Sequence, residues 1–333
     1  STHMCIEILN QNGVDVNLRD TDGFTPLHIA CQNGFYDIVK LLVHRDDINV
    51  NIKSISGKTP LIIACENGYL EIFKEIMSLD PQLTPSNEVN DDDIHKNRNS
   101  IDKTIMDLIV RSYIVDFDKD GDMSIIQAAA KSGNLNLVKT AIAISTREID
   151  YFTPTTMTAF SYACEKGSLD VVTYFVEKLK VDYNQVKLIS QIPLNVACLN
   201  GCTNVAIYLF GLPSIIRTGQ SLYLASSNNH LEIVKKILTF DEAIFPFNEF
   251  GLQSLCISCK KGYYDVVKAL LDSKKVPVNS QSDNMGPIHY ACKYNYPDIV
   301  KLLISNPKVD INMTRTEDEE KNFSPEYIPN LHH

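Results

Sequence analysis

Apolar residues recur along this chain with the spacing of helices that are buried on one side. After Gly34, the residues Ile38, Val39, Leu41 and Leu42 follow the i, i+1, i+3, i+4 pattern of such a helix. Similar stripes follow Gly68, Gly167 and Gly262. A shorter apolar run that ends in a small residue comes before each glycine. The pattern therefore predicts a unit made of a turn, a short helix, a Gly-marked break, a second helix and an extended link.

The unit repeats at a nearly fixed period. The small residues that mark its copies are Ala30, Ala64, Ala129, Ala163, Ala197, Ala225, Ser258 and Ala291. Successive gaps between them are 34, 65, 34, 34, 28, 33 and 33 residues. A helix pair of about 33 residues cannot bury its apolar stripe alone, so neighbouring units must stack. The sequence therefore predicts an array of repeats.

The opening of each unit resembles the ankyrin repeat. Thr25-Pro26-Leu27-His28-Ile29-Ala30 matches the T-P-L-H-x-A signature of that family. The stretches 59–64 and 286–291 also match well, whereas 220–225 and 253–258 match worst. The resemblance implies an all-α repeat solenoid of helix-turn-helix units with short β-hairpin-like turns. It also implies that Thr25, His28 and His289 brace the turns.

Irregular spacing divides the predicted array. The gap of 65 is close to two periods, so residues 80–122 are interpreted as a degenerate repeat with an acidic polar loop. Eleven acids against five bases give this stretch −6 of the net charge of −10. The gap of 28 predicts that the link 211–219 has lost most of a hairpin. The remaining predicted divisions are a cloning scar at 1–4, repeats at 5–79 with the first one partial, repeats at 123–313, and a tail or aborted capping repeat at 314–333.

Composition argues against nucleic acid as a partner and favours one kind of cellular compartment. An acidic chain with a pI near 5.3 and no Trp is unlike the basic surface that nucleic acid requires. No apolar run reaches the roughly 18 residues of a membrane span. Six of nine cysteines share one repeat position, which indicates buried free thiols, and such thiols favour a reducing compartment. We expect a monomer in the cytoplasm, with the nucleus as the alternative.

Candidate chemistry is sparse. The acidic turn Asp116-x-Asp118-x-Asp120-Gly121-Asp122 resembles a calcium loop, but its twelfth position is Gln127, which cannot supply the bidentate carboxylate. A similar Asp-x-Asp-Gly turn at 20–23 shows that this pattern belongs to the repeat. No nucleophile with a paired base and no phosphate-binding loop stands out. The prediction is a chain without catalytic activity, metal or cofactor.

Two repeat positions face the concave surface of the family. The residue before the hexapeptide is large and apolar in five of eight copies, and its members are Phe24, Lys58, Met123, Met157, Gln191, Gly219, Leu252 and Met285. The pair before the glycine changes from neutral and acidic to basic along the array, as in Gln32, Asn33, Glu66, Asn67, Lys260, Lys261, Lys293 and Tyr294. Met and Phe are favoured at binding surfaces, although packing between turn tips explains them equally well.

The sequence therefore predicts a protein-binding scaffold whose partner has an apolar centre and an acidic end. The alternative is a regulatory module of a larger protein, in which the acidic loop 80–100 or the acidic turn 116–122 senses a ligand or cation. The resemblance by itself does not separate these functions.

Overall fold

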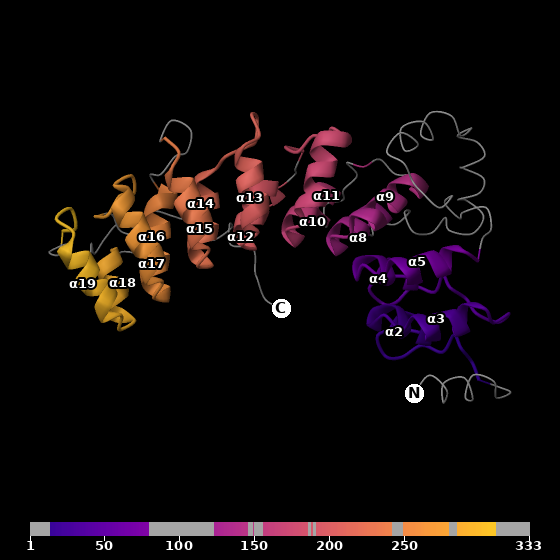
Figure 1. Cartoon of the computed structure of the whole chain (residues 1–333). Coiled ribbons are helices and arrows are strands. Elements are labelled where there is room, and N and C mark those ends of the chain that lie inside the picture. Colours follow the sequence, from indigo (N-terminus) through magenta and orange to yellow (C-terminus); the bar gives the residue numbers. More distant parts are fainter. Residues whose placement is uncertain are drawn as a thin grey trace. The chain divides into compact units, whose positions relative to one another are not determined.

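The computed structural model describes residues 14–79, 123–145, 156–185, 191–241, 249–279 and 285–310, together with residues 149 and 188. Within these residues the chain is helical and forms no β-strand (Figure 1). The helices divide between two compact units, residues 1–216 and residues 217–333. The predicted degenerate repeat at 80–122 and the predicted tail at 314–333 lie outside the described residues.

The helices come in pairs, as the apolar pattern predicts. The first unit holds α2 (Pro26–Asn33), α3 (Tyr36–Val43), α4 (Pro60–Glu66), α5 (Leu70–Met77), α8 (Ile125–Ser132), α9 (Leu135–Ile144), α10 (Ala159–Lys166), α11 (Leu169–Thr173) continued by the π-helical turn η1 (Tyr174–Lys178), α12 (Pro193–Leu199) and α13 (Thr203–Phe210). The second unit holds α14 (Gly219–Ser227), α15 (Leu231–Leu238), α16 (Glu249–Lys261), α17 (Tyr264–Ser273), α18 (Pro287–Lys293) and α19 (Pro297–Ser305).

Each unit stacks its first helices in one layer and its second helices in another. In the first unit, α4 contacts both α2 and α8, and α10 contacts both α8 and α12. In the second unit, α16 lies between α14 and α18, while α17 lies between α15 and α19. The third residue of the hexapeptide is fully or almost fully buried in seven of its eight copies, namely Leu27, Leu61, Ile126, Phe160, Leu194, Leu222 and Leu255. These side chains form the core between successive repeats.

A left-handed residue separates the two helices of a pair. Gly34 has φ +72° and Gly68 has φ +78°, a conformation that strains any residue with a Cβ atom. Asparagine takes the same place in the two pairs that lack the glycine, with φ 62° at Asn229 and 60° at Asn295. Asparagine tolerates this region better than other non-glycine residues. The predicted helix break is therefore confirmed.

Tight turns precede the first helices and contact one another. The backbone N–H of Asp20 donates to the Phe24 carbonyl at 2.9 Å, which closes a hairpin-like turn without a strand. The next turn tip attaches to this one, because the Ile55 N–H donates to the Asp22 carbonyl at 3.0 Å. The β-hairpin-like turns of the predicted fold are present in this form.

His28 braces two successive turns, as predicted. Its Nδ1 accepts from the Thr25 N–H at 3.0 Å, and its Nε2 lies 3.1 Å from the Lys58 carbonyl. The Nε2 atom must carry the hydrogen in this arrangement, because Nδ1 is already an acceptor. Gln127 makes the same two contacts in its own repeat, since its Oε1 accepts from the Ser124 N–H and its Nε2 donates to the Met157 carbonyl. At His289, Nδ1 again accepts from the N–H of Gly286.

The His28 brace predicts a pH-dependent stability. Burial lowers the pKa of His28 below its usual value, so the unfolded chain binds this proton more readily than the folded chain. The free energy of unfolding of the first unit should therefore fall as the pH is lowered from about 7 to about 5. Hydrogen exchange of the α2 and α4 amides at both pH values measures this change. His28→Gln should reduce the pH dependence, and an unchanged slope would contradict the prediction.

Lysines cap helix ends in the second unit. The Lys275 Nζ donates to the Leu238 carbonyl at 2.8 Å and to the Phe240 carbonyl at 2.6 Å. These carbonyls lie at and just beyond the end of α15, where no intrahelical donor is left for them. Lys275 belongs to the repeat of α16 and α17, whereas the helix end that it caps belongs to the preceding repeat, that of α14 and α15. Successive repeats of this unit are therefore joined by polar contacts as well as by their apolar core.

The short link 211–218 joins the last repeat of the first unit to the second unit. Only these residues separate Phe210, the end of α13, from Gly219, the start of α14. The boundary between the two units falls inside the link, between Ile216 and Arg217. The shortened repeat that the gap of 28 predicts is therefore also the place where the compact units divide.

The cysteine position is mostly a packing position. Cys31, Cys65, Cys164, Cys198 and Cys259 are buried and free, whereas Cys292 is exposed. Burial raises the pKa of the Cys31 thiol to about 12, which keeps it protonated and unreactive. In the described ranges no helix has the length and apolarity to cross a membrane.

Candidate partner-binding surface

Residues from the two predicted binding positions contact one another in the first unit. Lys58, from the turn tip, places its Nζ 2.7 Å from Oε2 of Glu66 at the end of α4. Lys131, at the corresponding position of α8, places its Nζ 3.3 Å from Oε1 of the same carboxylate. One carboxylate thus joins the turn position to the helix-end position and joins two successive repeats. We call the face made by the turn tips and the ends of the first helices the inner face.

One carboxylate on the inner face of the first unit is shared by two lysines. The Glu66 side chain is only 10% exposed and is shared by the two lysines, whose side chains are about 40% exposed. Lys131 also lies 5.9 Å from the centroid of the Tyr162 ring on α10. Glu66 therefore serves chiefly to hold neighbouring repeats together. Gln32, by contrast, is exposed at the end of α2.

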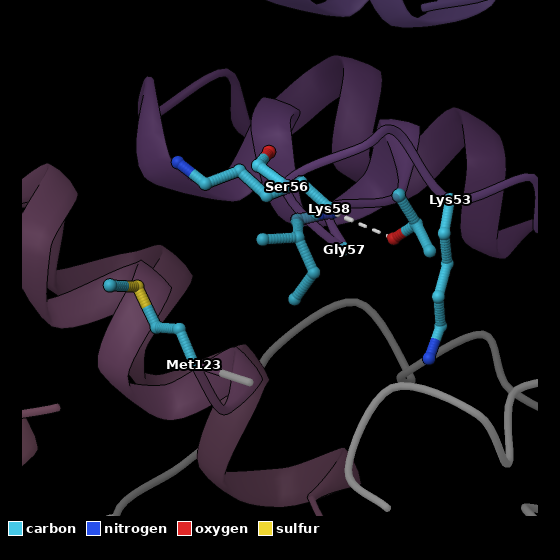
Figure 2. Close-up of a pocket in the computed structure, with 7 residues that line it drawn as sticks. Lys53, Ser56, Gly57, Lys58 and Met123 are labelled. Atoms are coloured by element: carbon cyan, nitrogen blue, oxygen red, sulfur yellow. Dashed lines mark hydrogen bonds between the residues drawn. The ribbon is translucent and has the colours of Figure 1, made fainter. Parts of the chain in front are cut away.

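The turn tips of the first unit are partly apolar. Phe24 is half-buried and stacks on the His28 ring, with centroids 5.4 Å apart and planes 4° from parallel. Met123 lines a small pocket of about 60 Å³ with Lys53 and Gly57. Figure 2 shows Met123 across this pocket from the turn that carries Lys58. These turn-tip side chains therefore pack partly on their own repeats and stay partly exposed to solvent.

The tip position is not uniform along the chain. Met157 and Met285 are half-buried, as Phe24 and Met123 are. Leu252 departs from the expected exposed ridge, because its side chain is only 8% exposed. The cause is local: α16 begins at Glu249, so Leu252 lies inside the helix rather than at a turn tip. Leu252 therefore belongs to the core of its repeat.

The second unit presents a basic inner face. Lys260 and Lys261 end α16, and Lys293 ends α18 with Tyr294 as its C-cap. Lys261 is turned to a structural contact, because its Nζ donates at 2.6 Å to the Ser227 carbonyl at the end of α14. Lys260, Lys293 and Tyr294 remain exposed.

Sequence reasoning missed several residues of the inner face. Lys131 occupies the same position as Glu66 in its own repeat, so comparison along that position would have found it. Ile55, at a turn tip, is 75% exposed, and Ile29 on α2 is also exposed. Neither isoleucine fell in the two positions that the resemblance indicated. The first unit therefore offers more apolar surface than predicted.

No metal site accompanies these residues within the described part of the chain. It contains no group of three His, Cys, Asp or Glu side chains that could hold an ion. The calcium-like residues Asp116, Asp118 and Asp120 lie outside the described residues, as do the segments 80–100 and 116–122 on which the regulatory alternative depends.

Comparison with known proteins agrees with the repeat geometry. A family model described as ankyrin repeats in three copies matches residues 1–87, 98–187, 125–216 and 222–315. The chain belongs to the ankyrin-repeat family. The predicted fold class, an all-α solenoid of ankyrin units, is thereby confirmed. Stacked ankyrin repeats typically present an extended surface for binding other proteins.

Two curated proteins each match a short stretch of this ankyrin protein. Protein phosphatase 1 regulatory subunit 27 from Mus musculus and its counterpart from Homo sapiens are each 46% identical to it over 39 residues. That stretch is 12% of this chain and 25% of each relative. The alignment thus spans about a quarter of the length of these relatives.

Proposed function

We propose that this chain is a non-catalytic scaffold that binds a partner protein or peptide on the inner face of its ankyrin repeats. The observation that carries the proposal is the shared carboxylate of Glu66. Its contacts to Lys58 and Lys131 join one turn tip and the ends of α4 and α8 into a surface that spans two successive repeats. A continuous surface of this kind suits a folded partner or an extended segment.

The absence of catalysis is part of the proposal. Membership in the ankyrin family supports it, and so does the short match to a regulatory subunit. The buried thiols support it as well, because burial raises the pKa of Cys65 and Cys164 well above the usual value and leaves them poor nucleophiles. We further propose that the chain acts as a monomer in the cytoplasm or nucleus, which suits its free cysteines.

Affinity capture from cells of the source organism tests the scaffold proposal. One variant alters the inner face of the first unit, Phe24→Ala with Met123→Ala. A second alters that of the second unit, Lys260→Glu with Lys293→Glu. The control, Lys268→Glu with Lys301→Glu, makes the same charge change on the second-helix layer. Leu252 is left unchanged because it is a core residue.

We expect the control to retain a partner that at least one inner-face variant loses. All variants should keep the circular dichroism of the wild type, because none of the altered side chains is fully buried. An identical set of captured proteins for all of them would contradict the proposal and would direct attention to the second-helix layer.

A further inference from the structure

Among the residues that the structure describes, no carboxylate pairs with the exposed lysines Lys260 and Lys293 on the inner face of the second unit. Its first helices α14, α16 and α18 contain a single carboxylate, Glu249, which lies at the opposite end of α16 from Lys260. Lys260 comes eleven positions after Glu249, a distance of about 16 Å along the axis at the helical rise. Glu249 already accepts from the Gln253 Nε2 at 3.2 Å. It is therefore too distant to compensate the basic helix end.

The first unit shows what compensation looks like at the same repeat position. There, a carboxylate on α4 stands between a turn lysine and the lysine of the next repeat, with N–O distances of 2.7 and 3.3 Å. In the second unit, the corresponding residues are Lys260 and Lys293 on successive helices, and neither forms an ion pair with another described residue. The carbonyl dipoles at these helix ends offset only part of each charge. A carboxylate from a partner, placed between these two lysines, would complete the same pattern.

An aromatic ring stands beside the second of these charges. The Lys293 Nζ lies 5.8 Å from the centroid of the Tyr294 ring, and Tyr294 is 41% exposed. A carboxylate that pairs with Lys293 can accept from the tyrosine hydroxyl, while the stem of its side chain packs on the ring. Lys261 is not part of this group, because its ammonium is held by the Ser227 carbonyl.

Resting on the proposed scaffold function, we propose that Lys260, Lys293 and Tyr294 form a binding site for an extended acidic peptide whose carboxylates are three residues apart. Neighbouring packed helices lie about 8–10 Å apart. A peptide in the extended polyproline II conformation advances about 3.1 Å per residue and has three residues per turn, so its side chains i and i+3 lie on the same face, about 9 Å apart. Carboxylates at positions i and i+3 of the peptide then meet Lys260 and Lys293, one on each helix.

Charge favours a peptide over other anions. The whole chain carries a net charge of −10, which repels polyanions such as nucleic acid and anionic membranes over long distances. A short segment with two carboxylates meets only the local positive surface. The distance between the two lysines, rather than total negative charge, should therefore decide which ligand binds.

Fluorescence anisotropy with two labelled peptides of identical composition tests the proposal on the full chain. One peptide carries two Glu residues three positions apart in a neutral background, and the other carries them adjacent. We expect the spaced peptide to bind at least about fivefold more tightly, and Lys260→Gln with Lys293→Gln to weaken it about tenfold at low ionic strength. Lys268→Gln with Lys301→Gln should leave the affinity unchanged. Tyr294→Ala should weaken the spaced peptide more than the adjacent one.

Equal affinity for the two peptides, or equal loss in the control variant, would overturn the proposal. Vesicles containing phosphatidylserine form a further arm: if they bind through the same lysines while neither peptide does, the patch is a membrane contact and the proposal fails. Failure of the peptide site can be told apart from failure of the scaffold function. If only the peptide site fails, neither peptide binds, but capture of a cellular partner still depends on the inner face.

Discussion

Gly34→Ala is expected to lower the free energy of unfolding of the first unit by about 2–4 kcal/mol, more than the same change at Gly68. Both glycines have a left-handed backbone, so both variants carry the strain of a Cβ atom in that region. At Gly34, the added Cβ would lie 2.8 Å from the Tyr69 ring, whereas at Gly68 its nearest neighbour is the Ser132 Cβ at 3.5 Å. Only the first variant must also displace a side chain.

The pair separates backbone strain from crowding. Guanidinium unfolding monitored by circular dichroism gives the two free energies, and we expect Gly68→Ala to cost about 1–2 kcal/mol. When Tyr69 is replaced by alanine as well, the additional cost of Gly34→Ala should move toward that of Gly68→Ala. Equal costs for the two glycine variants would show that Tyr69 moves aside freely and that crowding contributes nothing.

His28→Ala is expected to destabilise the first unit by about 2–4 kcal/mol, whereas His28→Gln should cost about 1 kcal/mol or less near pH 7. The alanine variant leaves the buried Thr25 N–H and the Lys58 carbonyl without the partner that each has now. Glutamine can make both contacts, because Gln127 already does so in its own repeat.

Hydrogen exchange of the turn amides distinguishes these outcomes from a general loss of packing. In His28→Ala, the Thr25 amide should exchange much faster, while in His28→Gln it should stay protected. If both variants were equally unstable, the shape of the imidazole ring, rather than its two hydrogen bonds, would be the property that the turn requires. The stacking of Phe24 on that ring provides the physical route for such a result.

The sequence predicted the repeat well, because its determinants are local. The left-handed glycines, the buried third residue of the hexapeptide and the bracing role of His28 each follow from one residue type at one position. The division into two compact units was not predicted, although it falls inside the link that the gap of 28 marked as shortened.

The binding surface was harder to predict, because exposure depends on neighbours. Leu252 is buried since α16 starts early, and nothing in its own residue type shows this. Glu66 was predicted to contact a partner, and its pairing with Lys131, 65 residues further along, could not be seen in the sequence. Lys261 was likewise indistinguishable from Lys260 before its contact to Ser227 was known. Pairings between repeats decide which charges remain for a partner.

The capping lysines of the second unit have a consequence for synthesis. Lys261 and Lys275 satisfy carbonyls that belong to the repeat before their own. When α14 and α15 leave the ribosome, the side chains that complete their ends have not yet been made. The repeat of α16 and α17 therefore completes the repeat before it, and a chain interrupted before residue 261 would expose the uncapped ends of α14 and α15 to quality control.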